Sequence, residues 1–262
     1  MKISDFINSK YENPNDFSKN YILNKPFPHI IFDDFFKNDL LNEVLNEFPD
    51  LSTIKNKFKH NNENENKFIS LGMKDLSNSA FNLISMLNSD VFLNYLQRLT
   101  GINEKLFSDP YLLGGGYHEI KKGGFLEVHA DFNKYNEVDL DRRINLLIYL
   151  NHNWDPNWNG NLQLYNKDNL KKPEVKIIPE FNRCVIFSTT SFTFHGHPEK
   201  LSCPENKSRK SLALYYYSKG RPKNEISRIH GTLFRNENKS MKEIFKDFLP
   251  PVLTRLFKKF IY

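Results

Sequence analysis

The 262-residue sequence predicts an α+β fold in which N-terminal helices pack against a β-sandwich or barrel. Helical patterns dominate the first hundred residues, and short strand-like runs separated by turn residues follow after Pro110. The composition is 39% hydrophobic, with 23 Phe and 12 Tyr, which is enough for a sizeable core. We therefore expect a single domain over residues 1–262, without an internal repeat.

The N-terminal part, residues 1–104, is expected to be mainly helical apart from one strand. The run 28–35 is β-branched and aromatic, which predicts that strand. Residues 39–48 place their apolar side chains on one helical face and end before a proline. Residues 74–88 and 90–99 predict two further helices.

The β core is expected over residues 105–220. Eight runs, bounded by turn residues, predict its strands: 115–120, 125–132, 143–150, 162–165, 175–178, 184–188, 192–195 and 212–217. Short strands at this spacing are typical of sandwiches and barrels. Helices first and strands after predict that the helices cover one sheet.

Two other segments are distinguished by their composition. Asn, Lys and Glu dominate residues 55–67, so we expect a solvated loop there. The C-terminal extension, residues 221–262, ends in a tail over 250–262 with one apolar stripe opposite three basic residues. Such a basic amphipathic helix either docks on its own domain or lies on an anionic membrane surface.

Charge and cysteine content narrow the partners and the compartment. The 37 basic and 31 acidic residues leave a net charge of +6, and no basic stripe accompanies a nucleic-acid motif, so we expect no nucleic-acid partner. Cys184 and Cys203 lack metal-binding spacing and suit a reducing compartment. No signal-peptide core or run of transmembrane length is visible. We expect a cytoplasmic chain, and the tail leaves open a peripheral position at the inner membrane surface.

The pair His129 and Asp131 carries the strongest chemical signal. Residues i and i+2 of a strand project from the same face, so both side chains can bind one ion. A distant histidine completes the two-His-one-carboxylate set that binds Fe(II) and leaves open positions opposite. Of the two candidates we expect His195, because it directly follows a strand-like run, whereas His197 precedes a proline at the start of a loop.

Arg209 and Ser211 form a second pair on one strand face. A guanidinium pairs bidentately with a carboxylate, and a serine hydroxyl adds another hydrogen bond. The pair therefore suits the distal carboxylate of a dicarboxylic keto acid whose other end chelates the metal. Lys210, between them, is expected to point the opposite way.

Residues 114–220 resemble the prolyl-4-hydroxylase-like branch of the Fe(II)/2-oxoglutarate-dependent oxygenases. The resemblance depends on the order of His-x-Asp, distal His and Arg-x-Ser. The similar stretches are 122–133, 143–151, 158–164, 194–198 and 209–211, with 26–31 and 34–35 nearer the N-terminus.

The resemblance implies a double-stranded β-helix core, the jelly-roll fold of cupins, packed by the N-terminal helices. It also implies that His129, Asp131 and His195 bind Fe(II). The far carboxylate of 2-oxoglutarate would then be bound by Arg209 with Ser211.

Two positions depart from the pattern of these oxygenases. Many relatives have a tyrosine that contacts the co-substrate where this chain has Ile120. We expect the replacing contact from Tyr117, His118 or Asn145. Asn161 stands where a second glycine is usual, in a turn.

The resemblance implies a dioxygenase that uses O2 and couples oxidative decarboxylation of 2-oxoglutarate to hydroxylation of an unactivated C–H bond. It favours a peptidyl proline as the substrate, whereas the basic tail favours a saccharide or another small, lipid-linked molecule. One alternative is a catalytically silent jelly-roll module that binds a ligand or partner. Another, cupin-like metal chemistry without oxidation, leaves Arg209 and Ser211 without a role.

Overall fold

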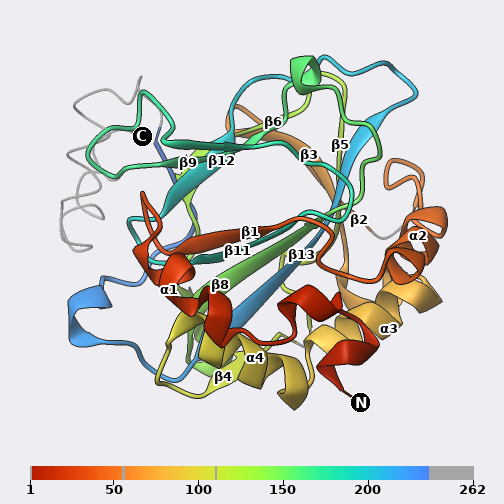
Figure 1. The fold of residues 1–262 in the computed structure, drawn as a ribbon. Helices are drawn as coiled ribbons and strands as arrows, with labels where there is room; N and C mark the ends of the chain where they lie inside the picture. The colour runs from red at the N-terminus through yellow and green to blue at the C-terminus, as the bar shows by residue number, and fades with distance from the viewer. Residues whose placement is uncertain (1, 55–56, 110, 236–262) are drawn as a thin grey trace, which may run out of the picture.

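The computed structural model describes residues 2–54, 57–109 and 111–235, and its centre is one curled antiparallel sheet (Figure 1). Ten strands follow one another along this sheet: β1 (His29–Phe32), β11 (Cys184–Ser188), β8 (Leu140–Tyr149), β13 (Ser208–Ser218), β5 (Gly116–Lys121), β3 (Glu65–Ser70), β6 (Phe125–Ala130), β12 (Phe194–His197), β9 (Leu162–Tyr165) and β10 (Val175–Ile177). Four more pair at its sides: β2 (Lys57–Asn61), β4 (Leu106–Ser108), β7 (Lys134–Tyr135) and β14 (Leu233–Phe234).

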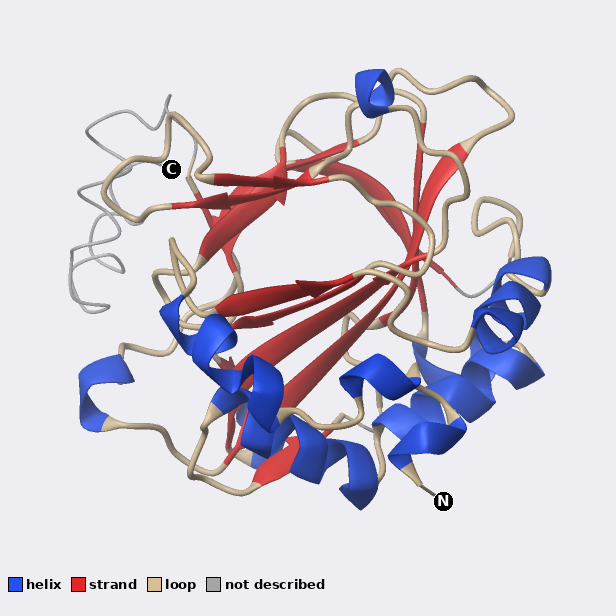
Figure 2. Ribbon diagram, in the orientation of Figure 1, coloured by secondary structure: helices blue, strands red, loops and turns tan. Residues whose placement is uncertain are grey.

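The sheet curls into two facing layers (Figure 2). Strands β1, β11, β8 and β13 form the layer next to the helices, and β6, β12 and β9 face them across the interior. Strands β5 and β3 connect the two layers at one side. This is the expected double-stranded β-helix.

The helices cover the outer face of the β8 and β13 layer (Figure 2). They are α1 (Asn15–Leu23), α2 (Asn38–Asn46), α3 (Asn78–Leu87) and α4 (Asp90–Thr100), with short 3-10 turns at Ile3–Asp5, Ser9–Tyr11, Gly72–Asp75, Asn136–Val138, Pro156–Trp158 and Lys223–Glu225. The Ser77 side chain caps α3, and Gly101 ends α4 in the left-handed conformation. Phe92 of α4 packs its ring 6.0 Å from that of Phe6 and 6.2 Å from that of Tyr216 in β13.

Side-chain alternation in β8 separates the core from the site. Ile144, Leu146 and Ile148 are fully buried and pack against the helices. Asn145 and Leu147 lie between them in sequence and therefore face the interior of the barrel. The helices stabilise this layer from behind, and its inner face is left for polar side chains.

The predicted loop over residues 55–67 is wrong, because most of that stretch belongs to the hairpin of β2 and β3. Ile69 of β3 pairs with His118 of β5, and Glu65 pairs with Leu126 of β6. Among the described residues, β2 pairs with β3 alone and is half-exposed at the side of the sheet. Polar side chains are therefore suited to this hairpin. Strands of the N-terminal part thus complete the sheet that the core strands begin.

The expectation that His197 lies in a loop is also wrong. Strand β12 begins at Phe194, two residues later than predicted, and continues to His197, which is 2% exposed. Its backbone pairs with β6, so the strand ends only at the following proline.

Both cysteines are buried and unpaired. No helix within the described ranges combines the length and apolarity needed to cross a membrane. The predicted amphipathic tail over residues 250–262 lies outside the described residues.

Candidate metal centre and adjoining cavities

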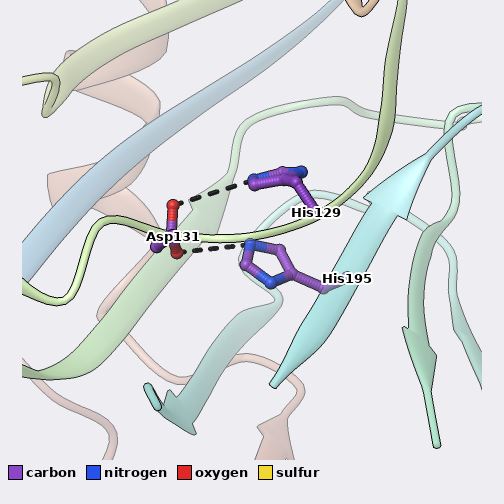
Figure 3. Close-up of side chains that lie close together, drawn as sticks. All are labelled: His129, Asp131 and His195. Atoms are coloured by element: carbon purple, nitrogen blue, oxygen red, sulfur yellow. Dashed lines mark ion pairs between the residues drawn. The ribbon is translucent and has the colours of Figure 1, made fainter. Parts of the chain in front are cut away.

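His129, Asp131 and His195 meet inside the barrel (Figure 3). His129 of β6 pairs directly with His195 of β12, and Asp131 follows β6 by one residue. One possible ligand atom from each lies within 4.8 Å of the other two. The Nε2 atoms of His129 and His195 lie 3.7 Å and 3.5 Å from carboxylate oxygens of Asp131. The fold therefore brings His195, the predicted distal histidine, to the pair.

The far ring nitrogens of both histidines bond to the backbone. Nδ1 of His129 lies 2.8 Å from the carbonyl of Glu127, and Nδ1 of His195 lies 3.1 Å from that of Thr193. A carbonyl only accepts, so each Nδ1 carries the hydrogen and each Nε2 keeps its lone pair toward Asp131. Burial and the neighbouring His129 lower the pKa of His195 to about 4. His195 is therefore neutral near neutral pH, as a metal ligand must be.

The Asp131 carboxylate is oriented by two side chains of β8. The Asn145 amide donates to its Oδ2 at 2.8 Å, and Nη2 of Arg142 lies 3.2 Å from the same oxygen. Arg142 also donates to Oδ1 of Asn145, and its guanidinium lies 3.5 Å from the centre of the Tyr215 ring. Burial opposes the charge on Asp131, yet Arg142 and then His195 hold its pKa well below the usual range. The carboxylate is thus ionised and fixed, so the three side chains fit Fe(II).

An inner cavity adjoins the three ligands. Its apolar wall is formed by Ile120, Leu126, Leu147 and Leu162, and its polar lining includes Lys67, His118, Asn145, His197, Arg209 and Ser211. Both members of the predicted Arg-x-Ser pair therefore face the cavity. Lys210 points the opposite way, as expected, with its ammonium 5.0 Å from the centre of the Phe48 ring.

Arg209 is a buried cation at this inner cavity. It is 5% exposed, and it donates from Nε to the carbonyl of Gly160 and from Nη2 to the hydroxyl of Tyr149. Burial lowers its pKa, and no carboxylate of the described ranges pairs with it. A buried charge requires a counter-charge, so the cavity is built for an anionic group, which fits a carboxylate of 2-oxoglutarate.

Tyr117 does not reach this cavity, so its predicted contact with the co-substrate is wrong. Its hydroxyl bonds to Ser77 at 2.8 Å, and its ring packs 4.4 Å from that of Phe48 on the helix side. Tyr117 and Ile120 are an odd number of residues apart on β5, so they face opposite sides of the sheet. His118 and Asn145, the other two candidates, do line the cavity.

Sequence reasoning missed two polar side chains of the site, Tyr149 and Lys67. It considered His197 only as the alternative distal ligand, at the start of a loop, whereas the structure places it on the same strand face as His195. Tyr149 could have been found in the same way, because it shares its parity on β8 with Asn145. No local sequence pattern assigns Lys67 to the site. It lines the cavity because β3 pairs with β5 and β6.

A second cavity, the outer cavity, borders His129 and Asp131. It shares six lining residues with the inner cavity, Lys67, Leu126, His129, Asp131, Arg142 and Tyr215. Its other lining residues are His60, Glu65, Ile69, Gly114, Phe132, Thr232 and Phe234. Phe234 lies on β14, which pairs with β6 beside His129, and the two rings are 5.5 Å apart. Both cavities therefore border the candidate metal centre.

Comparison with known proteins agrees with this geometry. Residues 115–217 match the model of the 2OG-Fe(II) oxygenase superfamily. The mouse prolyl 3-hydroxylase OGFOD1 is 38% identical over 79 residues, which are 29% of this chain and 14% of that protein. The chain therefore spans a small part of this relative's length.

Two solved structures share the fold. A prolyl-4-hydroxylase from Pseudomonas putida has a TM-score of 0.58 at 13% identity, covering 79% of this chain and 100% of its own. A prolyl hydroxylase from Trichoplax adhaerens, in complex with a hypoxia inducible factor peptide fragment, has a TM-score of 0.58 at 19% identity, with 80% and 91% covered.

The jelly-roll barrel and its buried two-His-one-carboxylate set are the arrangement that non-haem iron oxygenases use. Residues 115–217 are similar to the 2OG-Fe(II) oxygenase superfamily, and the fold of the chain is shared with prolyl hydroxylases. The three ligands fit Fe(II), and the inner cavity beside them fits 2-oxoglutarate.

Proposed function

We propose that this chain is a hydroxylase that acts on an unactivated C–H bond of a peptidyl proline. The observation that carries the proposal is the buried Arg209, which has no carboxylate partner among the described residues and lines a cavity next to His129, Asp131 and His195. A cation at this place has a role if a dicarboxylic keto acid binds there, and no role in cupin-like chemistry without oxidation.

Each part of the site has a task in this reaction. When bound, iron and 2-oxoglutarate supply the oxidising chemistry, in which O2 is consumed and the keto acid is decarboxylated. His129, Asp131 and His195 bind the metal, while Arg209 and Ser211 bind the far carboxylate. Asn145 acts on the site through Asp131, which it holds in place.

The outer cavity supports a substrate with an apolar ring. Three aromatic side chains line it, Phe132, Tyr215 and Phe234, together with Arg142. A pyrrolidine ring suits such walls, and the similar proteins include a prolyl 3-hydroxylase and a prolyl-4-hydroxylase. A saccharide or lipid-linked molecule is the second candidate, and the sequence of residues 250–262 favours it.

The first experiment is an anaerobic titration of the metal-free protein with Fe(II) and then with 2-oxoglutarate. We expect a visible metal-to-ligand charge-transfer band with the wild type, no band with His195→Ala, and much weaker keto-acid binding with Arg209→Ala. If the wild type binds iron but develops no band, the co-substrate assignment is wrong.

A second experiment separates the two substrate classes. We expect prolyl peptides to stimulate succinate release, and deletion of residues 250–262 to leave that turnover intact. If peptides fail and the deletion abolishes binding to anionic vesicles, a substrate at a membrane surface is the better proposal.

A further inference from the structure

His197 is a buried polar side chain whose ring nitrogens lack a hydrogen-bond partner among the described residues. It is 2% exposed. Buried polar groups are nearly always hydrogen-bonded, so two unpaired nitrogens on one ring indicate a ligand. The ring lines the inner cavity, together with Arg209 and Ser211.

The position of His197 along β12 suits the far end of the co-substrate. His195 and His197 both face the inner cavity, but only His195 belongs to the group that can hold a metal. Two residues of a strand correspond to roughly 7 Å. The two carboxylates of 2-oxoglutarate are joined through four C–C bonds of about 1.5 Å each, which gives a comparable separation.

Arg209 leaves room for a second donor. Its Nε and Nη2 already donate to Gly160 and Tyr149, so the edge formed by these two atoms is not available to a carboxylate. A carboxylate has four lone-pair positions and only accepts hydrogen bonds. An imidazole N–H that lines the same cavity can donate a hydrogen bond to a carboxylate position that the guanidinium leaves free.

We propose that His197 donates a hydrogen bond to the far carboxylate of 2-oxoglutarate and thereby selects a dicarboxylic keto acid. This inference rests on the proposed function, because it assigns a further binding residue to the same co-substrate. His197 is then a positioning residue for the keto acid and makes no contact with the metal.

The test compares two keto acids on the Fe(II)-loaded protein without O2. The probes are 2-oxoglutarate and 2-oxobutanoate, which has the same chelating end but no far carboxylate. His197→Phe keeps a ring of similar shape without an N–H, and His197→Gln keeps an N–H donor. Dissociation constants come from the charge-transfer band, Fe(II) affinity from calorimetry, and folding from thermal unfolding of the metal-free variants.

We expect His197→Phe to weaken 2-oxoglutarate binding about tenfold to a hundredfold, the effect of losing a hydrogen bond to a charged group. His197→Gln should recover much of this loss, and 2-oxobutanoate and Fe(II) should bind all three proteins equally. Wild-type affinity in His197→Phe overturns the inference. Equal weakening of both keto acids, or loss of Fe(II), also overturns it, by showing a packing or metal-binding role. If the wild type itself binds no 2-oxoglutarate, the proposed function fails along with this inference.

Discussion

Asp131 is the residue whose surroundings most affect the metal centre. Its charge is stable inside the barrel because Arg142 and Asn145 both contact the same carboxylate oxygen. Asn145 also accepts two hydrogen bonds from Arg142, so the three side chains hold one another in place. Such outer partners of a ligand set its orientation and its basicity.

Replacing Asn145 with leucine tests this arrangement at the residue scale. We expect Asn145→Leu to weaken Fe(II) binding about tenfold to a hundredfold, because Asp131 loses a donor and Arg142 loses its acceptor. Calorimetric titration under anaerobic conditions measures the affinity. Asn136→Leu, which removes an exposed amide, is the matched control and should bind Fe(II) like the wild type. Equal affinity in both variants would mean that Arg142 alone orients Asp131.

At the scale of elements, the contact between β12 and β6 places both histidines of the metal centre. The register of this pairing shifts between His195 and His197 of β12. His195 lies opposite His129, whereas His197 lies opposite Leu126. The extra residue in β6 presses its backbone against Gly196. A Cβ at that position would lie 2.8 Å from the carbonyl oxygen of Glu127.

We therefore expect Gly196→Ala to force the two strands apart. Overpacking of this kind costs about 1–3 kcal/mol of unfolding free energy, and Fe(II) affinity should fall because His195 moves with its strand. Chemical denaturation and metal titration measure the two effects. Gly231→Ala is the control, because no atom lies within 4 Å of a Cβ there. A stable Gly196→Ala variant with normal Fe(II) affinity would contradict the role of this contact.

The β2–β3 hairpin carries a pH-dependent contribution to stability. Burial disfavours the charge on Glu65, but the hydrogen bond from His60 and the nearby Lys67 lower its pKa from 4.5 to about 2. A carboxylate with a lowered pKa in the folded state stabilises the fold above pH 4.5. That contribution is lost as the pH falls toward about 2.

Glu65→Gln should accordingly lower the free energy of unfolding at neutral pH, by on the order of 2 kcal/mol. The difference from the wild type should shrink as the pH falls from 4.5 toward about 2. Denaturant unfolding at several pH values measures this difference. Glu63→Gln, at an exposed position of the same hairpin, serves as the control. A difference that stays constant with pH would show that packing, and not charge, is responsible.

At the scale of the whole molecule, ligand binding should stabilise the barrel, because the sites exist only in the folded chain. At a concentration one hundred times the dissociation constant, a ligand adds about 2.7 kcal/mol. For a chain of this size that corresponds to a rise in Tm of roughly 5–10 °C. We expect such a rise for Fe(II), a further rise for 2-oxoglutarate, and reversal of both by a chelator.

Arg209→Met separates the two contributions. Anaerobic thermal scans should show the rise from Fe(II) unchanged in this variant and the rise from 2-oxoglutarate lost, because the metal ligands are untouched while the buried cation is gone. A variant that still gains stability from 2-oxoglutarate would place the far carboxylate elsewhere.

Much of the fold and of the metal centre was predictable because the relevant signals are local. Helical periodicity located α2, α3 and α4, and runs of β-branched and aromatic residues located most core strands. The i+2 spacing put His129 with Asp131, and Arg209 with Ser211, on shared strand faces, and these pairs do line one cavity. Neighbours along a strand share geometry whatever the rest of the chain does.

The rest was decided by contacts between distant segments. The polar stretch over residues 55–67 contributes to a hairpin because β5 and β6 pair with β3, and β14 lies beside His129 because β6 pairs with it. Tyr117 turned out to face the helices. By itself the sequence determined which residues share a strand face and which chemistry they suit. Only the tertiary structure decided which faces meet around the metal, because strand pairing and burial are set by long-range packing that no local pattern encodes.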